Sequence, residues 1–207
     1  MDLTQVKHEI ETLAEKHRDE FETVSACIFA HPELAYHETL AQDQLCGLLE
    51  KHGFKVQRGA GSLETAFVAE YRSGKPGMTF AFMCEYDALP EIGHACGHHM
   101  PGPSVIGAAL ALRDTCKDQP YKIVIYGTPA EETIGGKIIM QEKGCFKDID
   151  IALMMHAAPS TCVDLRCMAL ECFYVTFHGV ESHAAMSSHK GKSAFDAALL
   201  SFQAIEF

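Results

Sequence analysis

Basic residues are scarce in this 207-residue sequence: 17 lysines and arginines stand against 28 aspartates and glutamates, a formal net charge of -11. The bases form no block along the chain, so the sequence lacks the electrostatic footprint of a nucleic-acid-binding protein. It also lacks an apolar run of membrane-spanning length, and residues 1–18 carry charges throughout, without the apolar centre of a signal peptide. These absences predict a protein with no nucleic-acid partner and no membrane segment.

Compact cysteine spacing is missing as well. The nine cysteines are odd in number and scattered, and several lie inside apolar runs, among them Cys27, Cys84 and Cys172. Such a distribution is typical of buried thiols in a reducing compartment rather than of a disulfide framework. With 47% hydrophobic and 22% charged residues, the chain has the composition of a globular protein with a sizeable core. We therefore expect a cytoplasmic protein.

The hydrophobic pattern predicts helices that alternate with strands over the first 160 residues. Apolar residues three or four apart indicate helices over residues 3–30, 37–53, 104–115 and 136–142. Short β-rich runs between turn signals indicate strands over residues 54–56, 65–71, 78–85, 121–126 and 149–155. This alternation implies an α/β fold, with a mostly parallel sheet and helices on both faces. In such sheets ligands bind where the carboxyl ends of the strands emerge.

Side chains able to bind a metal follow three of the predicted strands. These side chains are Asp87, Cys96, His98, Glu131, Glu132 and His156. A thiolate and an imidazole two residues apart, as in Cys96 and His98, can bind one divalent ion or two adjacent ones, and Gly97 between them permits a tight backbone turn. The sequence therefore predicts a metal site at the carboxyl edge of the sheet.

The pattern changes after Pro159. Residues 163–180 contain β-rich stretches, and a loop rich in glycine, serine and histidine leads into an apolar amphipathic helix over residues 193–207. We expect a first domain over residues 1–160 and the start of a second over residues 161–207. Because the sequence stops inside that last helix, with no cap and no further strand and helix to pack on it, we expect the chain to be truncated.

Five motifs follow one another between residues 85 and 184. They are EYDALP at 85–90, IGHACGH at 92–98, GTPAEE at 127–132, MH at 155–156 and SHA at 182–184. This order resembles the aminoacylase/carboxypeptidase G family of metallopeptidases, and more narrowly its amidohydrolase branch, which holds p-aminobenzoyl-glutamate hydrolases, indole-acetyl-amino-acid hydrolases and β-alanyl-lysine dipeptidases. The resemblance implies a zinc-exopeptidase-like catalytic domain over residues 1–160, followed by the start of a smaller α+β lid and dimerisation domain.

The resemblance also implies a role for each motif residue. The metal ligands, for two divalent ions of zinc or manganese, would be Cys96, His98, Glu132 and His156. Glu131 would be the general base, Asp87 would support a metal-binding histidine, and His183 would steady the oxyanion in the active site of a partner subunit. Glu85 is not expected to be a ligand. The implied protein is a homodimer that hydrolyses an amide bond in a small dipeptide or N-acyl amino acid, with dipeptides of β-alanine or γ-aminobutyrate and a basic residue favoured.

The adjacent carboxylates Glu131 and Glu132 suit this chemistry. One can bind metal while the other takes a proton from water and passes it to the leaving amine. Two ions about 3.5 to 4 Å apart lower the pKa of a shared water and clamp the carbonyl oxygen. Without further context, two adjacent glutamates would more often lie in the first turn of a helix, where the helix dipole favours negative charge. The place of this pair after the GTP run at 127–129, at a strand end, favours catalysis.

Two other functions stay open on the sequence alone. A cysteine hydrolase would use Cys96 as nucleophile and His98 as base, but residues two apart seldom orient as attacker and base, and Glu131 and Glu132 would have no role. The other possible function is that of a catalytically inactive fragment or a regulatory binding protein. It stays open because the family's last metal-ligand histidine belongs to a C-terminal segment that this sequence lacks.

Six of the 12 histidines are expected to be ordinary surface or hydrogen-bonded residues, namely His8, His17, His37, His52, His178 and His189. His94 and His99 stay undecided between that class and a place around the metal. The GGK run at 135–137 is too short for a phosphate loop and is expected only to permit a tight helix entry.

Overall fold

The computed structural model describes residues 2–133, 135–163, 169, 171 and 173–206. Its elements in chain order are α1 (Leu3–Lys16), α2 (Arg18–Ala30), α3 (Thr39–Lys51), β1 (Lys55–Arg58), η1 (Ala60–Ser62), β2 (Phe67–Arg72), β3 (Met78–Cys84), α4 (Pro101–Thr115), β4 (Tyr121–Gly127), α5 (Gly136–Glu142), β5 (Ile151–Met154), η2 (Ser188–Lys190) and α6 (Ala194–Glu206). The chain divides into two compact units, Met1–Ser160 and Thr161–Phe207.

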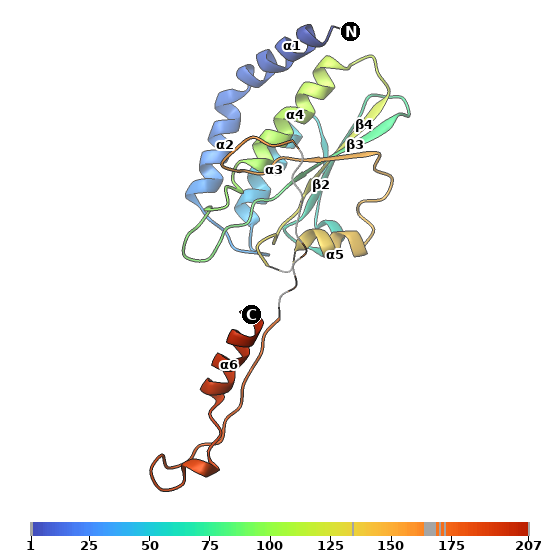
Figure 1. Ribbon diagram of the computed structural model, residues 1–207. Helices are drawn as coiled ribbons and strands as arrows, with labels where there is room; N and C mark the ends of the chain where they lie inside the picture. The colour runs from blue at the N-terminus through green and yellow to red at the C-terminus, as the bar shows by residue number, and fades with distance from the viewer. Residues whose placement is uncertain (1, 134, 164–168, 170, 172, 207) are drawn as a thin grey trace. The chain divides into compact units, whose positions relative to one another are not determined.

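A five-stranded sheet forms the centre of the first unit, in the order β1-β2-β4-β3-β5 (Figure 1). β3 pairs in parallel with β4 and β5, whereas β2 is antiparallel to β1 and β4. The predicted α/β fold is confirmed, but the sheet is mixed, and its parallel part is limited to β4, β3 and β5. The difference arises because β1 is joined to β2 by a short connection, residues 59–66, and a parallel pair would need a much longer crossover.

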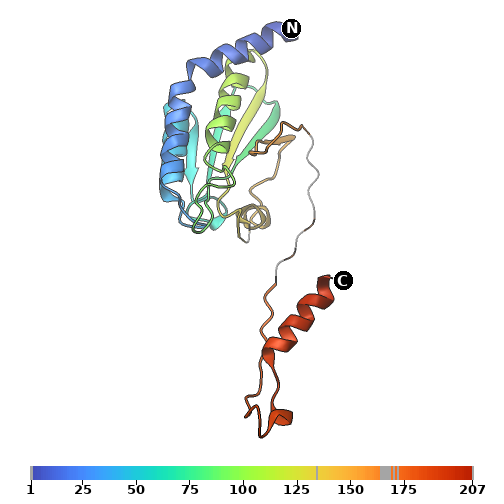
Figure 2. The same cartoon turned by 60° about the vertical axis from the view of Figure 1, so that its left-hand side comes forward.

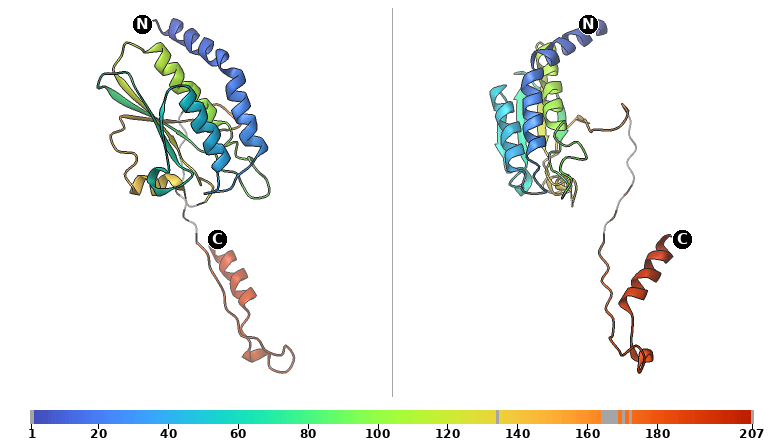
Figure 3. Two further views of the ribbon diagram at one scale, coloured as in Figure 1. Left: turned by 180° about the vertical axis from the view of Figure 1, so that it is seen from behind. Right: turned by 90° about the vertical axis from the view of Figure 1, so that its left-hand side faces the viewer.

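Helices cover both faces of the sheet, as the other views of the chain show (Figures 2 and 3). Side chains alternate along β4, so that Ile123 and Ile125 lie in one hydrophobic core while Val124 and Tyr126 lie in another. The first core packs α2, α3 and α4 against the sheet, and the second packs η1 and α5 against the opposite face. The crossovers from β3 to β4 and from β4 to β5 thus run over opposite faces.

The helix predicted over residues 3–30 is two helices. At His17, φ is -104° and ψ is 5°, and its backbone N–H bonds to the carbonyls of Leu13 and Ala14, which ends α1. Asp19 and Glu20 then occupy the first turn of α2, where the helix dipole favours acidic side chains. The hydrophobic pattern continues across this break, so periodicity does not reveal it.

The other elements predicted in the first unit are confirmed, with most boundaries shifted by two residues or fewer. The larger shift is in α4, which begins at Pro101 instead of residue 104. Proline fits the first helical position because its missing N–H would be unbonded there in any case. Pro101 therefore starts the helix rather than delaying it.

The second unit contains η2, α6 and a β-bridge between Val180 and Lys192. The prediction of a terminal helix is confirmed over Ala194–Glu206. Residues 173–179 form no strand, contrary to the expectation of β structure there, and Cys172 lies outside the described residues. A strand needs a neighbour to pair its backbone groups, and this described stretch has only the bridge at its end.

The thiols of the first unit differ in burial. Cys46 and Cys84 are fully buried, and burial raises the pKa of Cys46 to about 12. Cys84 is buried as predicted, but Cys27 is half-exposed, because it lies beside the stripe of α2 that Val24 and Ile28 bury. Free thiols are carried by Cys27, Cys46, Cys84, Cys96, Cys116 and Cys145. In the part of the chain that the structure describes, no helix is long and apolar enough to cross a bilayer.

Candidate metal centre

The predicted site residues of the first unit gather at one edge of the sheet. Following the strands in turn, Asp87 comes after β3, Glu131 and Glu132 after β4, and His156 after β5, and Glu85, which was not predicted to belong to the site, also follows β3. These strands are parallel neighbours, so their carboxyl ends lie side by side. α4 and α5, which follow β3 and β4, lie on opposite faces (Figure 1). When the helices that follow adjacent parallel strands lie on opposite faces of the sheet, ligands bind at the carboxyl ends of those strands.

His98 lies at the centre of this group and is 1% exposed. Its Nδ1 donates a hydrogen bond to Asp87 Oδ1 at 3.2 Å, because an ionised carboxylate can only accept. In the neutral ring the proton therefore lies on Nδ1. The lone pair on Nε2 points toward Nε2 of His156, which is 3.2 Å away.

His156 offers the same kind of nitrogen. Its Nδ1 donates to the backbone oxygen of its neighbour Ala157 at 2.7 Å, so its Nε2 also carries a lone pair. Two lone pairs facing each other repel unless a proton or a cation lies between them. The imidazole nitrogens of His98 and His156 are thus arranged as ligands for a shared positive charge.

Glu85 adds a buried oxygen to the two imidazoles. Its Oε2 has no hydrogen-bond partner among the described residues, and it lies 3.4 Å from His98 Nε2 and 3.9 Å from His156 Nε2. A buried carboxylate oxygen without a partner is costly. Burial by itself would lower the pKa of His98, but the hydrogen bond to Asp87 and the charge of Glu85 raise it. The cluster attracts positive charge, as a cation site does.

Asp87 fixes the orientation of two of these groups. It is 1% exposed, and while Oδ1 accepts from His98, Oδ2 accepts from the backbone N–H of Glu132 at 2.9 Å. Burial would raise the pKa of Asp87, but the hydrogen bonds from His98 and Glu132 outweigh it and lower the pKa. An aspartate that holds the ring of a ligand in this way sets its tautomer and raises its basicity.

The acidic pair Glu131 and Glu132 also lies near Nε2 of His98. Glu131 Oε2 and Glu132 Oε1 are each 3.9 Å from His98 Nε2, so the three side chains form a second donor group that shares His98 with the first. Burial and the negative charge of Glu85 raise the pKa of Glu131. Glu131 is also the more exposed of the pair, at 41% against 18% for Glu132. A carboxyl with these properties can exchange protons at the mouth of the site.

A buried carboxylate holds the loop that carries this pair. Glu38 is fully buried, accepts the backbone N–H of Ala130 at 2.8 Å through Oε1, and accepts the hydroxyl of Thr65 through Oε2. Ala130 has a φ of 59°, a conformation that is strained for a residue with a side chain. The sequence did not reveal this support, because Glu38 and Ala130 are 92 positions apart.

Cys96 lies next to Glu132 rather than next to the imidazoles. Its hydrogen bond with Glu132, burial and the surrounding negative charge raise the pKa of the thiol to about 11. Cys96 belongs to neither of the two donor groups around His98. Gly97 has a φ of 79°, and a Cβ there would lie 2.7 Å from Cβ of Ala157, so the predicted tight turn needs glycine. This turn places the loop of Cys96 and His98 against the loop after β5.

One pair at this edge was not predicted from the sequence. Lys137, in the first turn of α5, forms an ion pair with Oε1 of Glu85, which is 3% exposed. The GGK run was expected only to permit a helix entry, and Glu85 was not expected to take part in the site. The available signal was the position of Glu85 directly after β3, beside Asp87.

The three remaining candidate histidines lie outside the donor groups around His98. His183 belongs to the second unit, where its Nδ1 accepts the backbone N–H groups of Ala185 and Met186 at 3.3 and 3.2 Å. The proton of its neutral ring is therefore on Nε2. His94 is buried, and its ring packs edge-on against His99. Burial lowers the pKa of His94 and also that of His99, which favours the neutral form of both rings.

The sequence is similar to those of known proteins over most of its length. No family model matches the sequence. The chain is 38% identical over 192 residues to the Xaa-Arg dipeptidase of Mus musculus, a match that covers 86% of this chain and 44% of that protein. It is 33% identical over 211 residues to a p-aminobenzoyl-glutamate hydrolase polypeptide of Escherichia coli strain K12, a match that covers 92% of this chain and 44% of that protein.

A solved structure shares the fold. It is a Bacillus subtilis protein described as a dinuclear metal-binding peptidase from the M20 family, with a TM-score of 0.63 and 23% identity, and the match covers 70% of this chain and 44% of that one. At this identity the likeness shows the fold alone. The chain spans somewhat less than half the length of the curated relatives it matches.

Proposed function

This chain belongs to the M20 peptidases, the aminoacylase/carboxypeptidase G family, and from that premise we propose that it is a metal-dependent hydrolase of amide bonds in dipeptides or N-acyl amino acids. The observation that carries the proposal is the cluster around the buried His98, where two imidazole lone pairs and an unpartnered oxygen of the buried Glu85 face one another. The proposal is further supported by the relatives, which are named for dipeptide and acyl-glutamate hydrolysis.

The residues present fit a pair of divalent cations. The proposed ligands are Cys96, His98, Glu132 and His156; His98 lies in one donor group with His156 and in the other with Glu132, and Cys96 belongs to neither group. Zinc or manganese suits this mixture, because imidazole and thiolate favour zinc and carboxylates accept manganese. When bound, such ions lower the pKa of water and polarise a carbonyl oxygen. Oε1 of Glu85 is paired with Lys137, and its unpartnered Oε2 is the atom that would face a bound cation.

Glu131 is the proposed general base. Its carboxylate is close to His98 yet partly exposed, so it can accept a proton from water and deliver it to the leaving amine. The raised pKa of Glu131 favours the protonated form that the second transfer requires. Asp87 would act through His98, by holding its ring with the lone pair of Nε2 directed into the cluster.

His183 is the proposed oxyanion donor, and its role requires a homodimer in which each subunit completes its partner's site. The tautomer supports this role: because Nδ1 accepts two backbone N–H groups, Nε2 carries a proton that it can donate to an oxyanion. In the second unit the ring is exposed and able to make such a contact. Residues 1–160 would then form the catalytic domain, and residues 161–207 part of a lid and dimerisation domain.

The geometry favours metal chemistry over a cysteine nucleophile. The nitrogens of His98 face Asp87 and His156, and the pKa of Cys96 is raised, whereas a nucleophilic cysteine needs a lowered one. We also propose a cytoplasmic location, which the free thiols support.

The substrate is expected to be a dipeptide of β-alanine with a basic residue rather than an acyl-glutamate. β-Alanyl-lysine and p-aminobenzoyl-glutamate should be compared at equal, high enzyme concentration, with product release followed by chromatography. Turnover should disappear after dialysis against a chelator and return with zinc or manganese. Faster cleavage of p-aminobenzoyl-glutamate would reverse the proposed preference. Turnover that survives the chelator but is lost on thiol alkylation would instead indicate a cysteine hydrolase.

A further inference from the structure

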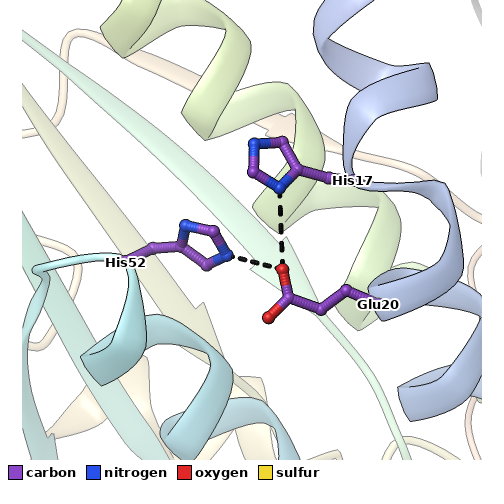
Figure 4. A group of neighbouring side chains, drawn as sticks. All are labelled: His17, Glu20 and His52. Atoms are coloured by element: carbon purple, nitrogen blue, oxygen red, sulfur yellow. Dashed lines mark hydrogen bonds and ion pairs between the residues drawn. The ribbon is translucent and has the colours of Figure 1, made fainter.

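A second group of metal-ligating side chains lies away from the centre described above. His17 stands at the break between α1 and α2, Glu20 is in the first turn of α2, and His52 follows α3 (Figure 4). α3 leads into β1, which runs in the same direction as β4, so the group lies at the amino edge of the parallel strands. The candidate metal centre lies at the opposite, carboxyl edge. The group of His17, Glu20 and His52 shares no residue with the donor groups around His98.

Both imidazoles of this group point at one oxygen. His52 Nε2 lies 2.9 Å from Oε2 of Glu20, and His17 Nδ1 lies 3.6 Å from the same atom (Figure 4). The second distance is too long for a hydrogen bond. Around a tetrahedral zinc with bonds of about 2.0 to 2.1 Å, ligand atoms are about 3.3 Å apart. The two observed distances lie on either side of that separation, and all three ligand atoms lie within 4.8 Å of one another.

The packing of the helices holds these side chains in place. The ring centroids of His17 and His52 are 5.0 Å apart and meet edge to face, and the ring of Phe21 packs against His17. Arg113 donates to the backbone oxygen of His52 at 2.6 Å, which fixes the end of α3. The three side chains are only 11 to 21% exposed. A metal would therefore meet ligands that are already ordered and partly dehydrated.

The charge on Glu20 is available to a cation. Burial would raise the pKa of Glu20, but its hydrogen bonds with Lys51 and His52 lower it, so the group is a carboxylate at neutral pH. Lys51 pairs with Oε1, which leaves Oε2 to face the two rings. The ammonium group of Lys51 opposes a metal by charge repulsion, but its side chain is 68% exposed and can turn into solvent at little cost.

We propose that His17, Glu20 and His52 form a second metal site, which takes a single Zn²⁺ ion. Two imidazoles and one carboxylate are a ligand set typical of zinc, and the oxygen-preferring ions Mg²⁺ and Ca²⁺ do not favour it. A fourth position is left for water. The ion joins the corner between α1 and α2 to the end of α3, and so it stabilises the folded chain in proportion to zinc occupancy.

Zinc binding should be measured by equilibrium dialysis on the purified chain and on variants whose folding is checked by circular dichroism. His17→Gln and His52→Gln should each abolish the binding of one equivalent of zinc, or lower the affinity for that equivalent by at least about tenfold. Lys51→Met should tighten the same equivalent, because it removes the opposing charge. His8→Gln, an exposed histidine of α1, is the matched control and should bind zinc like the wild type.

The Lys51→Met variant separates the metal site from a simple ion-pair network, in which losing Lys51 would leave zinc binding unchanged. Should a histidine variant fail to fold, the wild-type chain provides the test through its imidazole nitrogen NMR signals. Substoichiometric zinc should shift Nδ1 of His17 and Nε2 of His52. Equal zinc stoichiometry and affinity in the wild type and the folded histidine variants, or imidazole signals that do not move, would overturn the proposal. Neither result depends on hydrolytic activity or on the centre around His98.

Discussion

Replacing Glu131 by glutamine is expected to lower kcat by about 10²- to 10⁴-fold while the bound metal is retained. Glutamine keeps the size of the side chain but cannot accept a proton from water. The nearby Glu132, His98 and His156 are untouched, so metal content measured on the same sample should equal that of the wild type. kcat should be measured with β-alanyl-lysine at saturating concentration.

The matched control is Glu142→Gln, which changes an exposed glutamate in the last turn of α5. It should leave both kcat and metal content unchanged. A Glu131→Gln protein that loses metal would show that Glu131 is a ligand, as its membership of the second donor group allows. Unchanged kcat in that variant would exclude Glu131 as the general base.

Replacing Asp87 by asparagine is expected to weaken metal binding by about 10- to 100-fold. Asp87 accepts two hydrogen bonds, from Nδ1 of His98 through Oδ1 and from the N–H of Glu132 through Oδ2. Asparagine has a single acceptor oxygen, so its amide group must face one of these donors. Either the ring of His98 or the backbone that carries Glu132 then loses its orientation. Metal affinity is best measured by competition with a chromophoric chelator.

Asp150→Asn supplies the control for Asp87. Asp150 also accepts a backbone N–H through a carboxylate oxygen, from Thr79 at 2.8 Å, but it lies at the start of β5, at the far end from the metal centre. It should leave metal affinity unchanged. If Asp87→Asn binds metal as tightly as the wild type, Asp87 does not position the ligands.

The strands, the helices between them and the edge that carries the site could be predicted because each depends on local patterns. Apolar runs such as β4 and the turn signals around them mark the elements, and chemistry-bearing residues directly after strand ends mark the edge. The break at His17 could not be predicted in this way, since the hydrophobic stripe continues through it. Nor could the pairing of β2 with β4, because the pattern of a single strand does not specify its neighbour.

The supports of the site were harder to predict than its candidate ligands. Glu38 caps a backbone N–H 92 positions away, and Lys137 pairs with Glu85 across 52 positions. Such contacts are set by how the folded elements meet, and a single sequence carries no record of that. His17 and His52 were assigned to the ordinary surface class for the same reason: 35 positions separate them, and only the packing of α2 against α3 brings their rings together.

The assignment of the cluster around His98 as a metal centre is tested most directly by the metal content of the purified chain, determined by elemental mass spectrometry after incubation with zinc or manganese and removal of the excess. The measurement should be made in a His17→Gln, His52→Gln background, so that only the centre around His98 can contribute. We predict near-stoichiometric metal, lost when His98→Ala or Cys96→Ala is added. A chain that is folded by circular dichroism but binds no metal would contradict the assignment of this cluster as a metal centre.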